Sequence, residues 1–300
     1  MTKKIDVVLL TDARYVRPKE TTPYITNVLL EDRLVQQALY EEGLTTLRLA
    51  WDDPVFDWST THYALFRSTW DYFDRFGEFS NWLAKTGRKT CFINAENLIK
   101  WNIDKQYLQD LEQHGVHCAP TLFIEAGTAK TLAQLHKETQ WETTILKPVV
   151  SGAARHTYKL TPKNLQSHEA LFKKLIANES FMLQPFQHSI IEKGELSLII
   201  IDGAYSHAVL KKAKKGDFRV QDDYGGSVHQ YHPTSSEIAF AIKAVNACRP
   251  KPLYARVDMF TDNHGQLAIA ELELIEPELW FRMQPNAARK LAIAIKKLYR

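Results

Sequence analysis

Residues 253–277 decide the fold and read LYARVDMF, TDNHGQ, LAIAELELIEP. The outer segments are apolar and the central one is rich in turn residues, so the stretch predicts two antiparallel strands. Folding them about the turn places Asp258 opposite Glu271. Glu273 shares the face of Glu271, and Arg256 that of Asp258, because alternate residues of a strand point the same way. The sequence therefore predicts a sheet face with three carboxylates and an arginine.

Such a cluster of carboxylates repels itself unless a cation lies among them. Mg²⁺ prefers oxygen ligands and usually shares its coordination sphere with nucleotide phosphates, so the hairpin predicts a magnesium and nucleotide site. The alternative is a solvent-facing acidic hairpin. The apolar residues of the same stretch favour a central place in a sheet instead; these are Val257, Leu272, Leu274 and Ile275.

Composition indicates an ordinary globular protein with a large core and more than one lobe. The chain has 300 residues, of which 45% are hydrophobic and 24% are charged. Its formal net charge of +3 gives no general nucleic-acid-binding surface. Apolar runs are too short for a signal peptide or a membrane span. Three cysteines without CxxC spacing predict a reducing, cytoplasmic location.

Strand-like and helix-like segments alternate up to Asn94 and predict a small open α/β lobe. Strands are expected at 5–10, 45–49, 63–67 and 90–93, with helices at 31–42 and 78–86. In such lobes ligands bind beyond the carboxyl ends of the strands. The residues there are candidates for substrate contact and equally for ordinary caps or loops: Asp12, Arg14, Ser68, Thr69 and Asp71.

The rest of the chain predicts mixed α and β structure. Helices are expected at 103–114, 128–139, 165–177, 235–247 and from about 285, with Asn94, Asn102 and Thr128 as N-caps. Strands are expected at 141–148, 156–160, 181–186, 196–201 and 205–210, the last two joined through Asp202-Gly203. Residues 211–228 are expected to form a polar loop that begins with solvated lysines.

Single charges next to small or turn residues suggest phosphate contacts. Lys147 ends an expected strand and precedes the run Ser151-Gly152-Ala153-Ala154-Arg155. An ammonium group beside backbone N–H groups that can approach closely suits a phosphate. Lys105 lies in the first turn of an expected helix, and Gln184-Pro185-Phe186 ends a strand ahead of Glu195. Each feature alone is also typical of a protein surface, and only the combination is specific.

In this order the motifs resemble the ATP-grasp superfamily, from about residue 94 to the C-terminus. The segment Lys215-Gly-Asp-Phe-Arg219-x-Gln221, followed by Gly225-Gly226, resembles a loop of bacterial glutathione synthetases. With Arg67-Ser-Thr-Trp-Asp-Tyr72 and residues 271–277, the whole pattern is similar to glutathione-synthetase-like ligases, a group that includes the cyclo-ligase forming D-cycloserine.

The resemblance implies an α/β and α+β protein with the ATP-grasp fold and an N-terminal open α/β (pre-ATP-grasp) lobe. It divides the chain into a substrate lobe (1–94), a small ATP-grasp subdomain (95–184) and a C-terminal subdomain with the metal site (185–300). It implies ATP and two Mg²⁺ ions as cofactors, with Mn²⁺ as the alternative metal. It also implies small amino-acid-like carboxylate and amine substrates, no nucleic acid or membrane partner, and is compatible with a homo-oligomer.

The resemblance also assigns roles to residues. Phosphate contacts fall to Lys105, Lys147, Ser151 and Gly152. Adenine and ribose contacts fall to Gln184, Phe186 and Glu195; Phe186 is the donor neighbour because Pro185 has no N–H. Metal ligation falls to Asp258, Glu271 and Glu273, the last of which stands where the family commonly has Asn. Neutralisation of the transferred phosphoryl group falls to Arg219 and Arg256.

The predicted function is that of an ATP-dependent carboxylate–amine ligase. A substrate carboxylate would take the γ-phosphate of ATP, giving an acyl phosphate and ADP, and an amine would then displace phosphate. One alternative is intramolecular closure by a cyclo-ligase of the D-cycloserine-forming type. The other is a nucleotide-binding module without catalysis, which the complete acid set Asp258, Glu271 and Glu273 disfavours.

Overall fold

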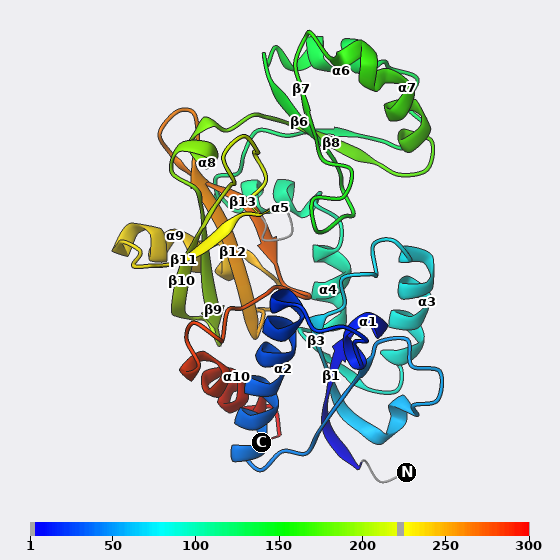
Figure 1. Cartoon of the computed structure of the whole chain (residues 1–300), viewed down its shortest axis with the longest axis vertical. Helices are drawn as coiled ribbons and strands as arrows, with labels where there is room; N and C mark the ends of the chain where they lie inside the picture. The colour runs from blue at the N-terminus through cyan, green and yellow to red at the C-terminus, as the bar shows by residue number, and fades with distance from the viewer. Residues whose placement is uncertain (1–3, 221–224, 300) are drawn as a thin grey trace.

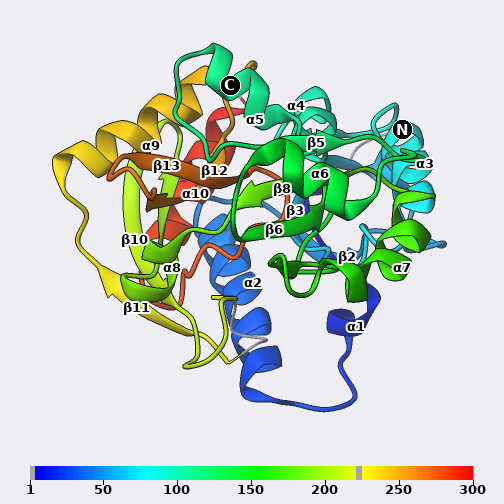
Figure 2. The same ribbon diagram turned by 90° about the horizontal axis from the view of Figure 1, so that it is seen from above.

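A computed structural model describes residues 4–220 and 225–299 and arranges their strands in three sheets (Figure 1). The first sheet, in the order β2-β1-β3-β4, is parallel. The second (β5-β8-β6-β7) and the third (β11-β10-β9-β12-β13) are antiparallel. Seen from above, the third sheet lies to one side of the second sheet and its helices (Figure 2).

The first sheet confirms the predicted α/β lobe. Its strands are β1 (Ile5–Thr11), β2 (Thr46–Ala50), β3 (Thr61–Ser68) and β4 (Cys91–Ile93). Its helices are α1 (Ala13–Val16), α2 (Pro23–Glu41) and α3 (Phe76–Thr86). Helix α2 begins at Pro23 rather than at the predicted residue 31. The Thr22 side chain caps its N-terminus, and proline suits a first helical turn, whose N–H groups have no partner within the helix.

The second sheet consists of short strands next to two helices. The strands are β5 (Leu122–Ile124), β6 (Thr144–Pro148), β7 (Tyr158–Leu160) and β8 (Phe181–Pro185). The helices are α6 (Leu132–Thr139) and α7 (Leu165–Ile176). The predicted cap Thr128 is wrong, because Thr131 forms a capping box with Gln134 and starts α6 there.

The third sheet contains the acidic hairpin. Its strands are β9 (Glu195–Ile201), β10 (Ala204–Lys212), β11 (Ser227–Tyr231), β12 (Tyr254–Thr261) and β13 (Leu267–Glu273). The nearby helices are α8 (His188–Glu192), α9 (Ser235–Ala247) and α10 (Asn286–Lys297). The predicted register is confirmed, since Asp258 pairs with Glu271 and Arg256 pairs with Glu273.

The predicted loop 211–228 is shorter in the structure. Strand β10 runs to Lys212 and β11 begins at Ser227, so the first two lysines of the run belong to the sheet. Residues 221–224 of this loop, with the motif residue Gln221, lie outside the described residues.

Apolar packing joins the first lobe to the third sheet. Helices α2 and α10 lie side by side, and their apolar residues share a core with Ile199, Ile201 and Val209 of the third sheet (Figure 1). On the other face, Leu198 and Ile200 pack against Ala241 and Val245 of α9. The sheet is therefore covered on both faces, as its apolar residues predict.

Two asparagines fasten β12 and β13 to the rest of the molecule. The prediction that Asn94 and Asn102 cap helices is wrong. The Asn94 amide group donates to the carbonyl oxygens of Tyr254 (2.9 Å) and Leu274 (2.7 Å). The Asn102 side chain donates to the Leu272 carbonyl (2.7 Å) and accepts from the Leu274 N–H (2.9 Å). Since β13 is an edge strand, these contacts satisfy backbone groups that have no neighbouring strand.

Two short helices replace the single helix predicted at 103–114. These are α4 (Glu96–Asn102) and α5 (Tyr107–Gln113), and Lys105 lies in the turn between them instead of in a first helical turn. The N–H of Lys105 donates to the Val149 carbonyl oxygen (3.0 Å), which fixes this turn against the end of β6.

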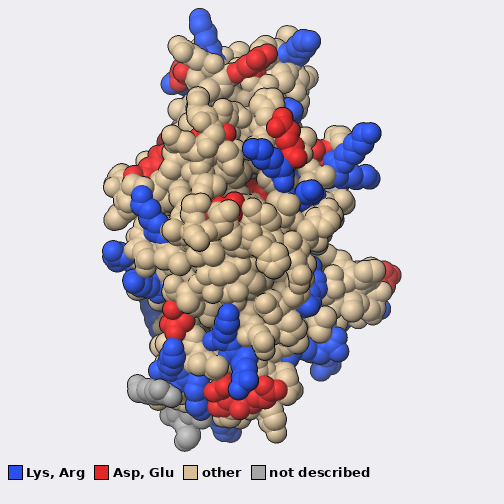
Figure 3. All heavy atoms as spheres, turned by 90° about the vertical axis from the view of Figure 1, so that its left-hand side faces the viewer, with Lys and Arg blue, Asp and Glu red and all other residues tan. Residues whose placement is uncertain are grey.

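The surface fits the small net charge. On the face drawn in Figure 3, acidic and basic side chains are interspersed among larger uncharged areas. Within residues 4–220 and 225–299, no helix is both long and apolar enough to cross a bilayer.

Candidate active site

A cavity of about 290 Å³ is lined by residues from the second and third sheets and from loops of the first lobe. Every residue predicted to contact nucleotide, metal or phosphoryl group lines it: Lys105, Lys147, Ser151, Gly152, Gln184, Phe186, Glu195, Arg219, Arg256, Asp258, Glu271 and Glu273. The fold therefore brings together side chains that the sequence spreads over more than half of the chain.

The acidic face of the hairpin carries its own cations. Asp258 is almost fully buried and accepts hydrogen bonds from Ser197 Oγ (2.6 Å) and Arg256 Nε (3.0 Å). Arg256 also pairs with Glu273, and its guanidinium lies 5.1 Å from the centre of the Trp280 ring. The third acid, Glu271, pairs with Lys105, whose Nζ lies 2.9 Å from Glu271 Oε1. Each predicted metal ligand is thus paired with a lysine or arginine.

These pairs set the pKa values of the acids. Burial opposes ionisation of Asp258, but Arg256 and Lys211 outweigh it and lower the pKa to about 2. Burial raises the pKa of Glu273 to about 8, because its pairing with Arg256 does not offset burial and the nearby charges of Glu271 and Asp258. Burial therefore opposes ionisation of Glu273 more strongly than Arg256 favours it.

The oxygen donors of this face suit Mg²⁺ in kind. Within the described ranges, however, no three His, Cys, Asp or Glu side chains converge as ligands for one ion. The side chains of Glu271 and Glu273 turn toward Lys105 and Arg256 instead. A divalent ion would have to displace these cationic partners, and the assignment of Asp258, Glu271 and Glu273 as ligands remains a prediction.

Lys211 is a site residue that the sequence reading missed. It was expected in a solvated loop, and that is wrong, because its side chain is buried between two acids. Its Nζ lies 2.6 Å from Glu195 Oε1 and 2.8 Å from Asp258 Oδ2. The signal was present in the β9–β10 hairpin. Its turn lies midway between residues 195 and 211, which pair directly in the sheet.

The phosphate end of the cavity combines two lysines with an irregular loop. Lys105 Nζ donates to the Ser151 carbonyl oxygen (2.6 Å). In the loop that follows β6, Ala153 and Ala154 adopt left-handed φ values of 49° and 53°. Non-glycine residues rarely adopt this conformation outside sites where the surrounding structure imposes it. Burial lowers the pKa of Lys147.

Gly152 is needed for packing against the first lobe. A Cβ atom at this position would lie 2.7 Å from Cε1 of the Phe73 ring. Even alanine would therefore require either the loop or the Phe73 ring to shift. This contact gives the glycine a structural role in addition to its predicted place beside the phosphates.

The predicted adenine contacts need one correction. The Phe186 N–H donates to the Thr143 carbonyl oxygen (2.9 Å), so it is not available to adenine as predicted. The Phe186 ring lines the cavity instead, with Lys159 Nζ 3.6 Å from its centre. Gln184 lines the cavity too, and its amide group donates to Thr121 Oγ1 (2.9 Å).

Arg219 reaches the cavity from the segment after β10. Its Nη2 lies 2.7 Å from Asp217 Oδ2, and its side chain is partly exposed. The hydrogen bonds from Arg219 hold the pKa of Asp217 well below its usual range.

The first lobe presents aromatic residues to the cavity rather than the predicted polar ones. Tyr24, Trp70 and Tyr72 line it. The earlier candidates do not. Asp12 caps α1 and pairs with Arg14, the Ser68 hydroxyl bonds to Thr11, and Asp71 accepts from Trp51 and Arg75. Thr69 is fully buried, and its hydroxyl has no hydrogen-bond partner among the described residues. Strand-end position alone did not show which side chains face inward.

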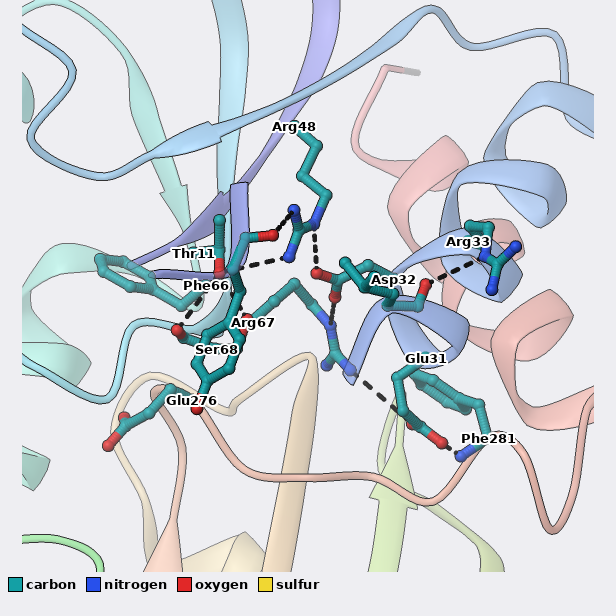
Figure 4. A network of polar contacts seen from close by, with 12 residues as sticks. Thr11, Glu31, Asp32, Arg33, Arg48, Phe66, Arg67, Ser68, Glu276 and Phe281 are labelled. Atoms are coloured by element: carbon teal, nitrogen blue, oxygen red, sulfur yellow. Dashed lines mark hydrogen bonds and ion pairs between the residues drawn. The ribbon is translucent and has the colours of Figure 1, made fainter. Parts of the chain in front are cut away.

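A buried ion network joins α2 to strands β2 and β3 of the first sheet (Figure 4). Asp32 of α2 accepts from Arg48 Nε (2.6 Å) and Arg67 Nε (3.3 Å). The neighbouring Glu31 accepts from the backbone N–H of Phe281 (2.9 Å). The network therefore fixes the segment after β13, which carries Glu276 and Glu278, against the first lobe.

Comparison with known proteins fits this geometry. Residues 7–94 match the family model of the N-terminal domain of the D-cycloserine synthetase DcsG. The chain is 27% identical over 267 residues to the cycloserine biosynthesis protein DcsG of Streptomyces lavendulae, which covers 84% of this chain and 88% of that protein. The crystal structure of D-cycloserine synthetase DcsG matches with a TM-score of 0.85 at 25% identity, over 98% of this chain and 99% of that one.

Other solved structures extend the comparison. The ATP-grasp ligase PsnB, in complex with a precursor variant, Mg and ADP, matches with a TM-score of 0.63 at 15% identity over 100% of both chains. The D-alanine–D-alanine ligase of Bacillus anthracis, in complex with ATP, matches with a TM-score of 0.64 at 11% identity, over 99% of this chain and 100% of that one. The chain is related to DcsG and shares the fold of the ATP-grasp ligases.

The cavity gathers the cationic side chains of the second and third sheets and the loops that join them. The lysines Lys105, Lys147 and Lys211 and the arginines Arg219 and Arg256 all line it. The first lobe closes its remaining side with aromatic residues. The hairpin acids and the aromatic residues Tyr24, Trp70 and Tyr72 thus line the same cavity.

Proposed function

We propose that this ATP-grasp ligase is a cyclo-ligase, which joins a carboxylate to a nitrogen of the same amino-acid-like molecule. The observation that supports this is the match to solved D-cycloserine synthetase over 98% of the chain at a TM-score of 0.85. The peptide-modifying ligase PsnB matches at 0.63. Ligation of two separate molecules is the alternative that the experiment below distinguishes.

The chemistry needs two displacements. The substrate carboxylate attacks the γ-phosphorus of ATP, so a carboxylate–phosphate bond forms and ADP leaves. The nitrogen then attacks the carbonyl carbon, the bond to phosphate breaks, and the nitrogen loses a proton. The product is a cyclic amide-type compound, and the other products are ADP and phosphate.

The residues of the cavity match these steps by charge. Lys105 and Lys147 would hold the phosphates of ATP, and Glu195 the ribose hydroxyls. Arg256 and Arg219 would neutralise the charge on the transferred phosphoryl group and on the tetrahedral intermediate. When bound, two Mg²⁺ ions (or Mn²⁺) held by Asp258, Glu271 and Glu273 would shield the phosphate oxygens.

The test is ATP-dependent phosphate release over a panel of amino acids that carry a second nitrogen. A cyclo-ligase should release phosphate with one compound alone, and product mass should equal substrate mass minus water. A requirement for a second amine would instead indicate ligation of two molecules. If none of the compounds in the panel supports phosphate release, the ligase assignment is refuted for this substrate class.

A substitution ties the activity to the hairpin. Glu271→Gln removes one charge and keeps the shape, so turnover should be abolished while the fold is retained. Glu273→Asn should be milder, because an amide oxygen can still bind a metal. Glu138→Gln is the matched control, since Glu138 lies on α6 in an exposed pair with Lys130. Near-normal activity in Glu271→Gln would refute the metal assignment.

A further inference from the structure

One carboxylate of the cavity lacks the cationic partner that its neighbours have. Glu195 and Asp258 pair with Lys211, Glu271 pairs with Lys105, and Glu273 pairs with Arg256. Glu278 pairs with Arg282. Within the described ranges, Glu276 forms no ion pair, although it lines the same cavity. Among the described residues, the cavity thus has one acid that forms no ion pair.

Glu276 lies where the acidic face of the hairpin meets the first lobe. It follows β13 by three residues, and its backbone carbonyl oxygen accepts from Trp70 Nε1 (3.0 Å). Its carboxylate points away from the network of Glu31, Asp32 and Arg67 (Figure 4). The phenol of the buried Tyr72 is its side-chain neighbour from the first lobe.

Two aromatic residues of the first lobe, Trp70 and Tyr72, lie next to Glu276. Trp70 and Tyr72 line the cavity with Tyr24, whose ring centre lies 6.2 Å from that of Trp70. The faces of such rings carry negative potential and attract cations within about 6 Å. Trp70 meets Glu276 with its indole N–H, and Tyr72 meets it with its hydroxyl group, so both rings lie beside this residue. A carboxylate beside aromatic rings suits an organic ammonium group, whose charge is attached to apolar carbon.

The charged groups near Glu276 are two acids and one lysine, and that lysine is paired with another acid. The third sheet contributes Glu271, Glu273 and the phenol of Tyr254, the α4–α5 turn contributes Lys105, and the first lobe contributes the phenol of Tyr72. Lys105 is already paired with Glu271. Burial raises the pKa of Glu276 to about 7, and a bound cation would favour its ionised form.

We propose that Glu276, with the rings of Trp70 and Tyr72, binds the ammonium group of an α-amino acid substrate. This rests on the proposed function. In an α-amino acid a single carbon separates the ammonium group from the carboxylate. An ammonium group held at Glu276 therefore sets the carboxylate near Glu273 and Arg256, at the metal-binding face where it is to be phosphorylated.

The experiment compares substrates that differ only in this group. For each amino acid that supports phosphate release, the matched 2-hydroxy acid replaces the ammonium group with a neutral hydroxyl. Wild type should prefer the amino acid by at least 10-fold in kcat/KM. Glu276→Gln should lose most of that preference through a higher KM for the amino acid, with the KM for ATP within twofold of wild type.

Two further variants separate binding from folding. Glu276→Asp keeps the charge and should restore part of the preference, and Glu138→Gln should leave it unchanged. Thermal unfolding of Glu276→Gln shows whether the variant is folded; if it is not, the Glu276→Asp and Trp70→Phe variants carry the test, with a preference reduced in both. An unchanged preference in the folded Glu276→Gln variant would overturn the proposal.

The proposal can fail independently of the proposed function. If no amino acid of the panel supports phosphate release by the wild type, the proposed function fails. The ammonium subsite is then tested by calorimetry with D-cycloserine and its N-acetyl derivative in the presence of ADP and Mg²⁺. Binding of D-cycloserine that is at least 10-fold weaker in Glu276→Gln, with no change for the N-acetyl compound, supports the subsite. Equal binding in both proteins overturns it.

Discussion

Replacing Lys211 with Met tests whether this buried lysine stabilises the fold by neutralising Glu195 of β9 and Asp258 of β12. Lys211→Met keeps most of the side-chain volume and removes the charge that lies 2.6 Å from Glu195 and 2.8 Å from Asp258. Asp258 keeps Arg256 and Ser197 as partners. Glu195 loses the only ion-pair partner that the described residues give it.

The magnitude follows from that difference. Removing one partner of a buried ion pair costs about 3–5 kcal/mol. Because only Glu195 is left without a cation, we expect the lower end, about 3 kcal/mol of unfolding free energy in metal-free protein at neutral pH. For a chain of this size that corresponds to a fall of roughly 6 °C in the unfolding temperature.

The sign of the pH dependence gives a second readout. Burial raises the pKa of Glu195 even with Lys211 present, and the variant should raise it further. A group whose pKa is raised by folding stabilises the protein at low pH and loses that contribution as pH rises through the folded pKa. The deficit of Lys211→Met should therefore be small at pH 4 to 5 and full at pH 8.

Urea unfolding of the metal-free protein measures both effects. The matched control is Lys212→Met, because Lys212 is the next residue of β10 and is exposed. The control should lie within about 0.5 kcal/mol of wild type, as is usual for surface substitutions. Equal stability of the two variants at pH 8 would refute the role assigned to Lys211.

Three other outcomes can be measured directly. In metal-free wild type, the free energy of unfolding should fall as pH rises from 4.5 to 8, because the pKa values of Glu276 (about 7) and Glu273 (about 8) are raised above 4.5. Added Mg²⁺ should make this pH dependence weaker. Urea titrations measure the free energy of unfolding, and a rise with pH would contradict the prediction. Lys147→Ala should weaken ATP binding by at least ~1.5 kcal/mol, roughly tenfold in Kd by calorimetry, and an unchanged Kd would remove Lys147 from the site. Arg219→Ala should lower kcat more than it raises the KM for ATP, since its contact strengthens as charge develops, and steady-state kinetics with a normal kcat would show that Arg219 is ordinary surface.

The sequence was most informative where a local rule also governs the tertiary structure. The pairing of Asp258 with Glu271 follows from strand alternation and the position of one turn, and the structure confirms it. The same reasoning applied to the β9–β10 hairpin would have paired Lys211 with Glu195. A run of lysines is typical of a solvated loop, and this composition does not reveal that Lys211 is buried.

Other features depend on contacts between distant residues. Asn94 and Asn102 precede or end helical segments, which is typical of capping, yet their amide groups bind backbone that is more than 150 residues away in sequence. Nothing local distinguishes the two uses of an asparagine. Similarly, the position of a residue after a strand did not show that Trp70 and Tyr72, rather than Asp71, face the cavity.

The side-chain contacts along β13 have a consequence for self-association. An edge strand with free backbone groups can pair with the edge of another molecule and so begin aggregation. Here Asn102 occupies the backbone groups of Leu272 and Leu274, and the Tyr107 hydroxyl accepts from the Leu272 N–H (2.9 Å). The Ile269 N–H donates to the His117 carbonyl oxygen (3.0 Å). These contacts prevent β13, which carries Glu271 and Glu273, from pairing with a strand of a second copy of the chain. The two acids can therefore line the cavity from an edge strand that does not promote aggregation.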